Sequence, residues 1–217
     1  MDPLSAEQLR VLGVLIEKEV TTPDQYPLTM NGLLLACNQT SNRQPVVSYT
    51  TDDVEPVLTS LREAGLVRVV HSPSNRAVKY RHVAGETWEL GAGELAVLAV
   101  LALRGPQTVN ELRTRTERYA GLEDLGGVEG VLHRLKNRYS EPWVIRLERR
   151  PGQREERWMH LLAGEITEEL LSSAEEVGER GLSTTARVSA LEAQVAQLAL
   201  DLSAMKAQLE RFSSLLE

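Results

Sequence analysis

The segment "LRVLGVL" at residues 9–15 decides the fold, because its pattern returns as "LAVLAVL" at residues 95–101. Both segments follow Leu-x-Val-Leu-x-Val-Leu and lie 86 residues apart. A second pattern, Val-Glu-x-Val-Leu-x-x-Leu, occurs as "VEPVLTSL" at 54–61 and again as "VEGVLHRL" at 128–135. Since residue type, order and spacing agree, we interpret the chain as two copies of one unit of about 80 residues.

Capping and breaking residues mark three helices in the first copy. Ser5 caps the start of the first helix, and Thr21-Thr22-Pro23 breaks it. Thr50 with Asp53 caps the start of the third helix, and Gly65 ends it. These signals predict a first helix that runs to about Val20, a second over about 28–37 and a third after Thr50. The apolar-rich segments "LVRVV" and "AVKYRHV" flank "HSPSN" and predict a β-hairpin after the third helix.

The second copy repeats these signals. A first helix is expected over about 93–104, although Gly91 is a weak residue for its N-cap. Thr108 with Glu111 forms a capping box for the second helix, and Asp124 is placed to cap the third. The segments "WVIRLERR" and "REERWMHL" flank "PGQ" and predict a second hairpin.

Three helices followed by a hairpin are typical of the winged-helix domain, a variant of the helix-turn-helix. The predicted fold class is therefore mainly α with small β-hairpins (α+β), with two tandem winged-helix domains and a C-terminal coiled-coil helix. The predicted domains are a first winged helix at 1–84, a linker at 85–90, a second winged helix at 91–163, an acidic linker at 164–183 and the coiled-coil helix at 184–217.

The C-terminal segment carries apolar residues in alternating steps of three and four, which is a heptad pattern over about four repeats. The pattern predicts a coiled coil that joins two chains into a homodimer, with a trimer as the other order. An amphipathic helix that packs on its own domain is the alternative. The heptad residues are Val188, Leu191, Val195, Leu198, Leu202, Met205, Leu209, Phe212 and Leu216.

The composition sets limits on class and compartment. The chain has 217 residues with 42% hydrophobic residues, enough to bury a core. No apolar run reaches the roughly 18 residues of a membrane span, and the N-terminus lacks a secretory pattern, so we expect a cytoplasmic protein without membrane contact. The single cysteine, Cys37, lies on an apolar helical face and is expected to be buried.

The sequence offers no recognisable catalytic or cofactor motif. It lacks the glycine-rich nucleotide loops, His-Glu-x-x-His and Cys-x-x-Cys. Its four histidines, His71, His82, His133 and His160, are scattered along the chain. We therefore expect no enzyme, no cofactor and no metal site.

A run of seven polar residues separates the second and third helices of the first copy. Such side chains are suited to phosphate and base-edge contacts, or to contacts with a protein partner. The alternative is structural, with Asn38 ending the helix and the other side chains in water. Acidic residues at the start of the next helix, Asp52 and Asp53, oppose a nearby phosphate backbone. The run consists of Asn38, Gln39, Thr40, Ser41, Asn42, Arg43 and Gln44.

Basic residues concentrate in the second copy, although the whole chain has a net charge of −7. Residues 131–160 hold eight basic and four acidic side chains, whereas 163–180 hold six glutamates and one arginine. The basic side chains are predicted to contact nucleic acid through the third helix and the hairpin, unless the local glutamates pair with them. The predicted contacts are Arg134, Lys136, Arg138, Arg149, Arg150, Arg154 and Arg157, together with Arg76 and Lys79 on the first hairpin.

Four segments resemble the YceH-like bacterial proteins. They are "VTTPDQYPLTMNGLLLACNQTSNRQPVVSYT", "NRAVKYRH", "LALRGPQTVNELRTR" and "EERWMHL". The resemblance covers essentially the whole chain and implies a tandem winged-helix fold. It implies no catalytic residues. Gly91 departs from the serine-like cap that is more usual at the start of its helix.

Two hypotheses for function follow. The first is a cytoplasmic, non-enzymatic protein that binds double-stranded DNA, a dimeric transcriptional regulator that uses the basic third helix and wing of the second copy. The second is an adaptor that binds a protein partner through the tandem winged helices. Salt-sensitive binding to DNA favours the first, and a stoichiometric partner retained after nuclease treatment favours the second.

Overall fold

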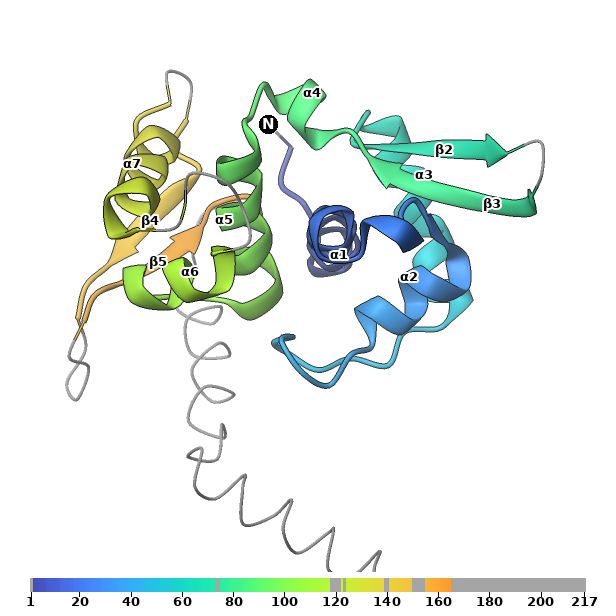
Figure 1. Ribbon diagram of the computed structural model, residues 1–217, viewed down its shortest axis with the longest axis horizontal. Coiled ribbons are helices and arrows are strands. Elements are labelled where there is room, and N and C mark those ends of the chain that lie inside the picture. The colour runs from blue at the N-terminus through green and yellow to red at the C-terminus, as the bar shows by residue number, and fades with distance from the viewer. Residues whose placement is uncertain are drawn as a thin grey trace, which may run out of the picture. The chain divides into compact units, whose positions relative to one another are not determined.

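Two successive runs of three helices and a hairpin make up the computed structural model (Figure 1), which describes residues 2–72, 75–117, 122, 124–138, 141–149 and 155–164. In the first copy they are α1 (Ala6–Thr21), α2 (Met30–Cys37), α3 (Thr51–Glu63), β2 (Val67–Ser72) and β3 (Asn75–His82). In the second they are α5 (Ala92–Arg104), α6 (Val109–Thr116), α7 (Leu125–Lys136), β4 (Val144–Leu147) and β5 (Arg157–His160). The remaining elements are the 3-10 helix η1 (Pro23–Gln25), the short strand β1 (Leu28–Thr29) and α4 (Ala84–Trp88).

The predicted capping residues start these helices. The Asp53 carboxylate accepts hydrogen bonds from the amide and hydroxyl of Thr50, at 2.8 and 2.7 Å. Asp124 Oδ1 accepts from the Gly127 amide at 2.7 Å. Such bonds satisfy polar groups that a helix end leaves without an intrahelical partner. The sequence therefore located the starts of α3 and α7 correctly.

Glycines occupy two positions that the sequence singled out. Gly65 follows α3 with φ 69°, the left-handed conformation expected for a helix-ending glycine. Gly91 precedes α5, and its amide donates to Glu94 Oε2 at 2.8 Å. In a capping box, the N-cap side chain and the side chain three residues later each accept from the other's backbone amide. Gly91 has no side chain, so only the bond to Glu94 is formed.

The same backbone hydrogen bonds recur in both copies. The amide of Leu66 donates to the carbonyl of Leu61 at 2.8 Å as the chain leaves α3, and the amide of Trp143 donates to the carbonyl of Leu135 at 2.9 Å after α7. Each bond ties the segment that follows a third helix back to the last part of that helix.

Each hairpin also pairs with the segment that leads into the second helix of its copy. Leu28 of β1 pairs antiparallel with Tyr80 of β3. Gln107 forms an isolated antiparallel bridge with Trp158 of β5. Leu28 and Gln107 both directly precede a threonine that caps the next helix. The first copy therefore has a three-stranded sheet, β1-β3-β2, and the second has a two-stranded sheet, β4-β5.

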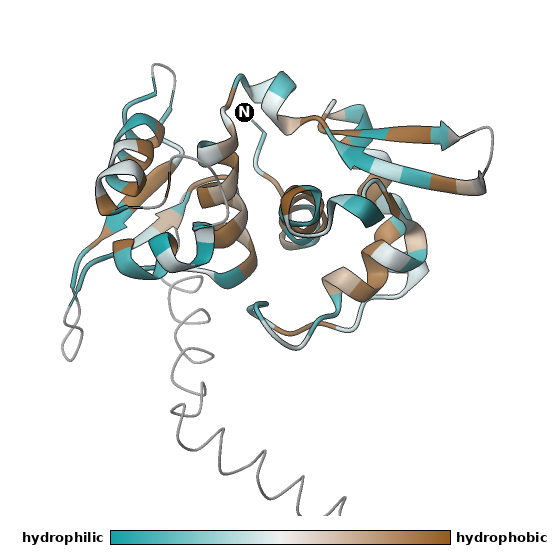
Figure 2. Ribbon diagram, viewed as in Figure 1, coloured by the Kyte–Doolittle hydropathy of each residue, from teal (hydrophilic) through white to brown (hydrophobic). Residues whose placement is uncertain are grey.

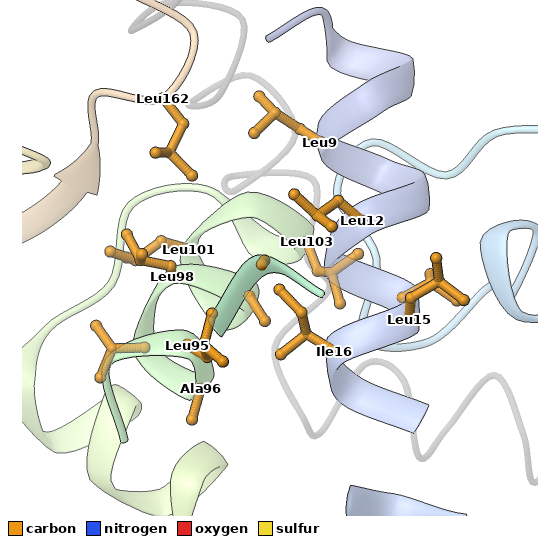
Figure 3. Close-up of a cluster of buried hydrophobic side chains, with 14 of the residues drawn as sticks. Leu9, Leu12, Leu15, Ile16, Leu95, Ala96, Leu98, Leu101, Leu103 and Leu162 are labelled. Atoms are coloured by element: carbon orange, nitrogen blue, oxygen red, sulfur yellow. The ribbon is translucent and has the colours of Figure 1, made fainter. Parts of the chain in front are cut away.

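The first helices of the two copies, α1 and α5, pack against each other and join the buried residues into one hydrophobic cluster. Figure 3 shows Leu12 and Ile16 of α1 directed toward Leu95 and Leu103 on the α5 side. Figure 2 shows hydrophobic and hydrophilic residues interleaved on α1, and mostly hydrophilic residues on α6. The helices approach closely at Gly13, where an added Cβ would lie 3.0 Å from Leu103 Cγ.

Two details differ from the sequence predictions, and one prediction falls outside the described residues. The segment 85–90 was expected to be a linker, but α4 occupies most of it, and Trp88 and Leu90 are buried. The helix expected over 28–37 begins at Met30, because Leu28 and Thr29 pair with β3. The acidic linker after residue 164 and the heptad helix lie outside the described residues.

Candidate interaction site

The polar run 38–44 is tied to the fold at its first residue. Asn38 ends α2, and its side chain closes the loop on Tyr49. Asn38 Oδ1 accepts from the Tyr49 amide and Asn38 Nδ2 donates to the Tyr49 carbonyl, both at 2.8 Å. A side-chain amide that satisfies both backbone groups of one residue fixes the loop ends. The structural alternative for Asn38 is therefore the one observed.

Two buried arginines hold the loop from the protein side. Arg43 Nε donates to the Ala36 carbonyl at 3.0 Å, and its guanidinium nitrogens lie 2.6 and 3.0 Å from the Glu17 carboxylate. Arg10 of α1 donates to the carbonyls of Cys37 and Pro45. Since the carbonyls at a helix C-terminus lack intrahelical partners, the two guanidinium groups act as caps for α2. Arg43, with a fully buried side chain, does not face a partner.

The middle of the run is exposed. Thr40, Ser41 and Asn42 are exposed, whereas Gln39 and Gln44 are half-buried. The amide of Gln44 donates to the Leu103 carbonyl at 2.8 Å, which places the loop against the end of α5. The surface that this loop offers is thus three residues wide rather than seven.

A groove of about 770 Å³ lies in the second copy among α6, α7 and the hairpin β4–β5. Apolar lining comes from the start of α6, the start of α7 and the middle of β5, and charged residues supply most of the remainder. Leu125 is 42% exposed and thus presents an apolar side chain to this groove. The lining residues are Val109, Asn110, Leu125, Glu129, His133, Lys136, Arg146, Arg149, Glu155, Glu156 and Trp158.

We call this groove the α7 groove, and among its described lining residues the lysine and arginine side chains equal the glutamates in number. Lys136, Arg146 and Arg149 face three glutamates, and Arg146 lies 3.0 Å from Glu156 in an ion pair. A phosphate backbone is favoured by an excess of positive charge. A balanced rim around apolar side chains instead resembles the anatomy of a protein–protein contact.

Three of the predicted DNA contacts in the second copy have partners within the protein. Arg134 lies 3.1 Å from Glu94, although it stays 61% exposed. Arg138 stacks over the Trp143 ring with 4.5 Å to its centroid, and it donates to the Trp88 carbonyl at 3.0 Å. Arg138 is therefore part of the packing between α7 and α4.

Arg157 is likewise engaged, because it lies 2.8 Å from Glu111 and donates to the Pro106 carbonyl at 2.9 Å. Lys136 and Arg149 line the groove, as stated above. Arg150 and Arg154 lie outside the described residues. The structure thus brings two of the seven predicted residues, Lys136 and Arg149, to one surface.

The first hairpin is the most basic element among those described. Strands β2 and β3 contain four Arg or Lys residues and no acid. Arg68 and Arg81 each contact Glu86 of α4, at 3.3 and 3.4 Å. Lys79 is half-buried, and Arg76 lies three residues before it on β3. This hairpin is where the predicted contacts Arg76 and Lys79 lie.

Two histidines occupy matching buried sites at the ends of the hairpins. His82 pairs with Val67, and His160 pairs with Val144. His82 Nε2 lies 2.9 Å from Glu19 Oε2, and burial lowers the pKa of His82. Burial lowers the pKa of His160 to about 4. Both histidines are therefore neutral at pH 7.

A search of the described residues finds no group of three His, Cys, Asp or Glu side chains that could hold a metal ion. Within the same residues, every helix is too short or too polar to cross a membrane. Burial raises the pKa of the Cys37 thiol to about 12, which keeps it in the unreactive thiol form.

Sequence reasoning missed two residues that organise the polar run, Arg10 and Glu17. Arg10 is the one charged residue within "LRVLGVL". A charge in an otherwise apolar segment needs buried hydrogen-bond partners, so its position could have indicated a structural role. Glu17 carried no local signal, since its partner Arg43 lies 26 positions away.

The helices and the small antiparallel sheets make this a mixed α/β protein. The chain belongs to the family described as "Protein of unknown function, DUF480", whose family model matches residues 4–153. The resemblance to the YceH-like proteins is therefore confirmed.

Relatives match over nearly their whole length. A "UPF0502 protein" of Serratia proteamaculans is 47% identical over 206 residues, which cover 93% of this chain and 95% of the relative. A "UPF0502 protein" of Solibacter usitatus is 48% identical over 195 residues, covering 90% and 92%. The "UPF0502 protein YceH" of Salmonella schwarzengrund is 44% identical over 211 residues, covering 95% and 97%.

Proposed function

We propose that this chain is a non-enzymatic adaptor built from two tandem winged-helix units, and that its α7 groove binds a segment of a protein partner. The observation that carries the proposal is the combination in one groove of the exposed Leu125, the half-buried Trp158 and, among the described lining residues, an equal number of basic and acidic side chains. Aromatic and apolar anchors inside a polar rim are the usual composition of a protein interface.

The chemistry of the groove specifies the kind of segment that fits. An apolar side chain of the partner would contact Leu125 and Trp158. Flanking residues of both charge signs would meet Lys136 or Arg149 on one side and Glu129 or Glu155 on the other. A segment of one sign only would leave half of the rim against like charge, which disfavours nucleic acid in this groove.

Affinity capture with the full-length protein tests the adaptor function. Lysate treated with nuclease is passed over the wild type, Leu125→Glu and Leu35→Glu. Leu125→Glu puts a carboxylate into the groove at a helix start, where it suits the helix dipole. Leu35→Glu makes the same change on α2, where the leucine is 75% exposed and far from the groove lining.

One stoichiometric partner that Leu125→Glu loses and Leu35→Glu retains is the expected result. A partner that both variants retain, or the absence of any stoichiometric partner, would contradict the proposal. Folding of Leu125→Glu is checked by its circular dichroism spectrum and melting temperature.

DNA binding is the second candidate, and the acid-free hairpin β2–β3 favours it. In a winged helix the hairpin can reach the phosphates or an adjacent groove. Arg76→Ala with Lys79→Ala should weaken binding to a genomic duplex and make it less sensitive to salt, as measured by fluorescence anisotropy between 50 and 200 mM salt. Unchanged binding would remove this candidate.

In either function, we propose that the heptad residues 188–216 form the homodimer, which analytical ultracentrifugation of Leu198→Glu tests.

A further inference from the structure

Strand β4 is the open edge of the second sheet. On the far side of β5, Gln107 and Trp158 exchange both of their backbone hydrogen bonds, at 3.0 and 2.7 Å. Trp158 lies opposite Arg146 of β4. Because the backbone groups of Trp158 are directed away from β4, those of Arg146 are directed away from β5. They face a side where, among the described residues, no strand pairs with β4, so this edge can accept another strand.

The side chains along this edge alternate in character. Ile145 and Leu147 lie on one face of the sheet and Arg146 on the other, since successive side chains of a strand point to opposite faces. Ile145 is 40% exposed, and the Arg146 side chain is 54% exposed. Glu148 directly follows the strand and is exposed. If the strand is continued by one residue, Glu148 shares the face of Arg146, and that face carries a base and an acid two positions apart.

The matching edge of the first copy, on β2, lacks this pattern. The residues of β2 that correspond to Arg146, Leu147 and Glu148 are Val69, Val70 and His71. Strand β2 contains no acid, and its register with β3 shifts between Val70 and Ser72. Bulges and basic side chains protect an edge from pairing with another strand. Strand β4, in contrast, pairs regularly with β5 over all of its residues.

We propose that β4 pairs antiparallel with β4 of a second copy of this chain, about a two-fold axis at Leu147. Such an axis, perpendicular to the sheet, sets each residue opposite one on the same face. Centred on Leu147, the pairing sets Arg146 of each copy opposite Glu148 of the other, so both contacts join opposite charges. Centred on Arg146, it would set two like charges directly opposite each other, which is unfavourable.

The backbone supports the same register. Since the backbone groups of Arg146 face the open side, those of Leu147 face β5 and those of Glu148 face the open side again. Arg146 of one copy and Glu148 of the other would then exchange two hydrogen bonds, and the symmetric pair would exchange two more. The two Leu147 residues would form the intervening pair without hydrogen bonds, in which the Cα atoms lie about 4.5 Å apart and the side chains touch.

The ion pair that Arg146 already makes is compatible with this contact. Arg146 lies 3.0 Å from Glu156, and a guanidinium group has donors enough to bind a second carboxylate. Because Arg146 also lines the α7 groove, the pairing would join the hairpins that border two such grooves. The contact needs neither a protein partner nor DNA, so it does not depend on either proposed function.

Cysteine cross-linking of the full-length protein tests the pairing. Leu147→Cys is compared with Val70→Cys, at the matched and equally half-buried position of β2. The chain's own Cys37 is buried and stays out of the reaction. Each protein is incubated with oxidised glutathione and run on a denaturing gel without reductant.

Leu147→Cys should give a disulfide-linked dimer that reductant dissociates, because residues about 4.5 Å apart across the axis are within the range of a disulfide. Val70→Cys should run as a monomer. Absence of the Leu147→Cys dimer, or equal yields of dimer from the two variants, overturns the proposal.

Charge reversal in the Leu147→Cys protein tests the register. Arg146→Glu alone, or Glu148→Arg alone, sets like charges opposite each other in both pairs and should slow cross-linking by roughly tenfold. An equimolar mixture of the two variants, left to exchange subunits before oxidation, restores opposite charges in both pairs. The mixture should cross-link about as fast as Leu147→Cys and give the heterodimer in mass spectrometry. A mixture that cross-links no faster than either variant alone overturns the register.

Discussion

The Glu17 carboxylate lies 2.6 Å from the guanidinium of Arg43, which is 26 positions later in the sequence. Arg43 belongs to a polar loop whose middle residues are exposed. Arg43 also donates to the Ala36 carbonyl at the end of α2. One side chain thus joins the loop to α1 and to α2. This arrangement makes Arg43 an anchor of the loop.

Replacing Arg43 with methionine should lower the free energy of unfolding by about 3 kcal/mol, because the change leaves the Glu17 carboxylate half-buried without its partner. Urea denaturation followed by circular dichroism measures the effect. Arg134→Met removes an exposed ion pair with Glu94 and should cost less than about 1 kcal/mol. Equal losses in the two variants would show that the Glu17–Arg43 pair has no special role.

Asn38→Ala should lower the free energy of unfolding by about 2 kcal/mol, since it removes two hydrogen bonds to the backbone of Tyr49. Ser41→Ala, at an exposed position in the same run, should change stability by less than about 0.5 kcal/mol. Thermal melts compare the two. If Ser41→Ala were the more destabilising change, the loop would be held by its exposed residues instead of by Asn38.

The sequence predicted the elements whose signals are local. Asp53 bonds back to the N-cap residue Thr50, and Asp124 caps α7, through hydrogen bonds that reach only three residues along the chain. Gly65 ends α3 because a left-handed turn needs no partner elsewhere. Such features follow from residue type and spacing alone, so the order of helices and hairpins was predictable.

The candidate site was harder to predict because it depends on which distant side chains meet. Arg138 looked like a DNA contact within a basic helix, yet it stacks on Trp143. Arg157 looked like part of a basic wing, yet Glu111, 46 positions earlier, binds it. Counting charges in a window cannot reveal such contacts, because the groups that bind these arginines are an aromatic ring and a backbone carbonyl for Arg138 and a distant acid for Arg157.

The close approach of α1 and α5 gives a third prediction. Gly13→Val should destabilise the protein by about 2 kcal/mol, because its Cβ would lie 3.0 Å from Leu103 Cγ and force the two helices apart. Gly130→Ala in α7 meets nothing closer than Arg134 Nη1 at 3.7 Å and should stabilise by about 0.5 to 1 kcal/mol. Urea denaturation of both variants should show opposite signs. A gain in stability for Gly13→Val would mean that the helix seam tolerates larger side chains.

His160 predicts how stability depends on pH. Burial lowers its pKa to about 4 in the folded protein, against 6.5 for an ordinary histidine, so the unfolded chain takes up the proton first as pH falls. Stability is therefore fully present above pH 6.5 and is lost between pH 6.5 and 4, by up to about 3 kcal/mol from this residue. His160→Leu, which removes the titrating group but keeps an apolar volume, should lose less stability than the wild type between pH 7.5 and 4.5. Burial also lowers the pKa of His82, so His82 should account for part of the stability that the His160→Leu variant still loses in acid. His133→Gln alters an exposed histidine and should follow the wild-type curve in urea denaturation. If His160→Leu kept the full wild-type loss, protonation of His160 would not be what destabilises the fold in acid.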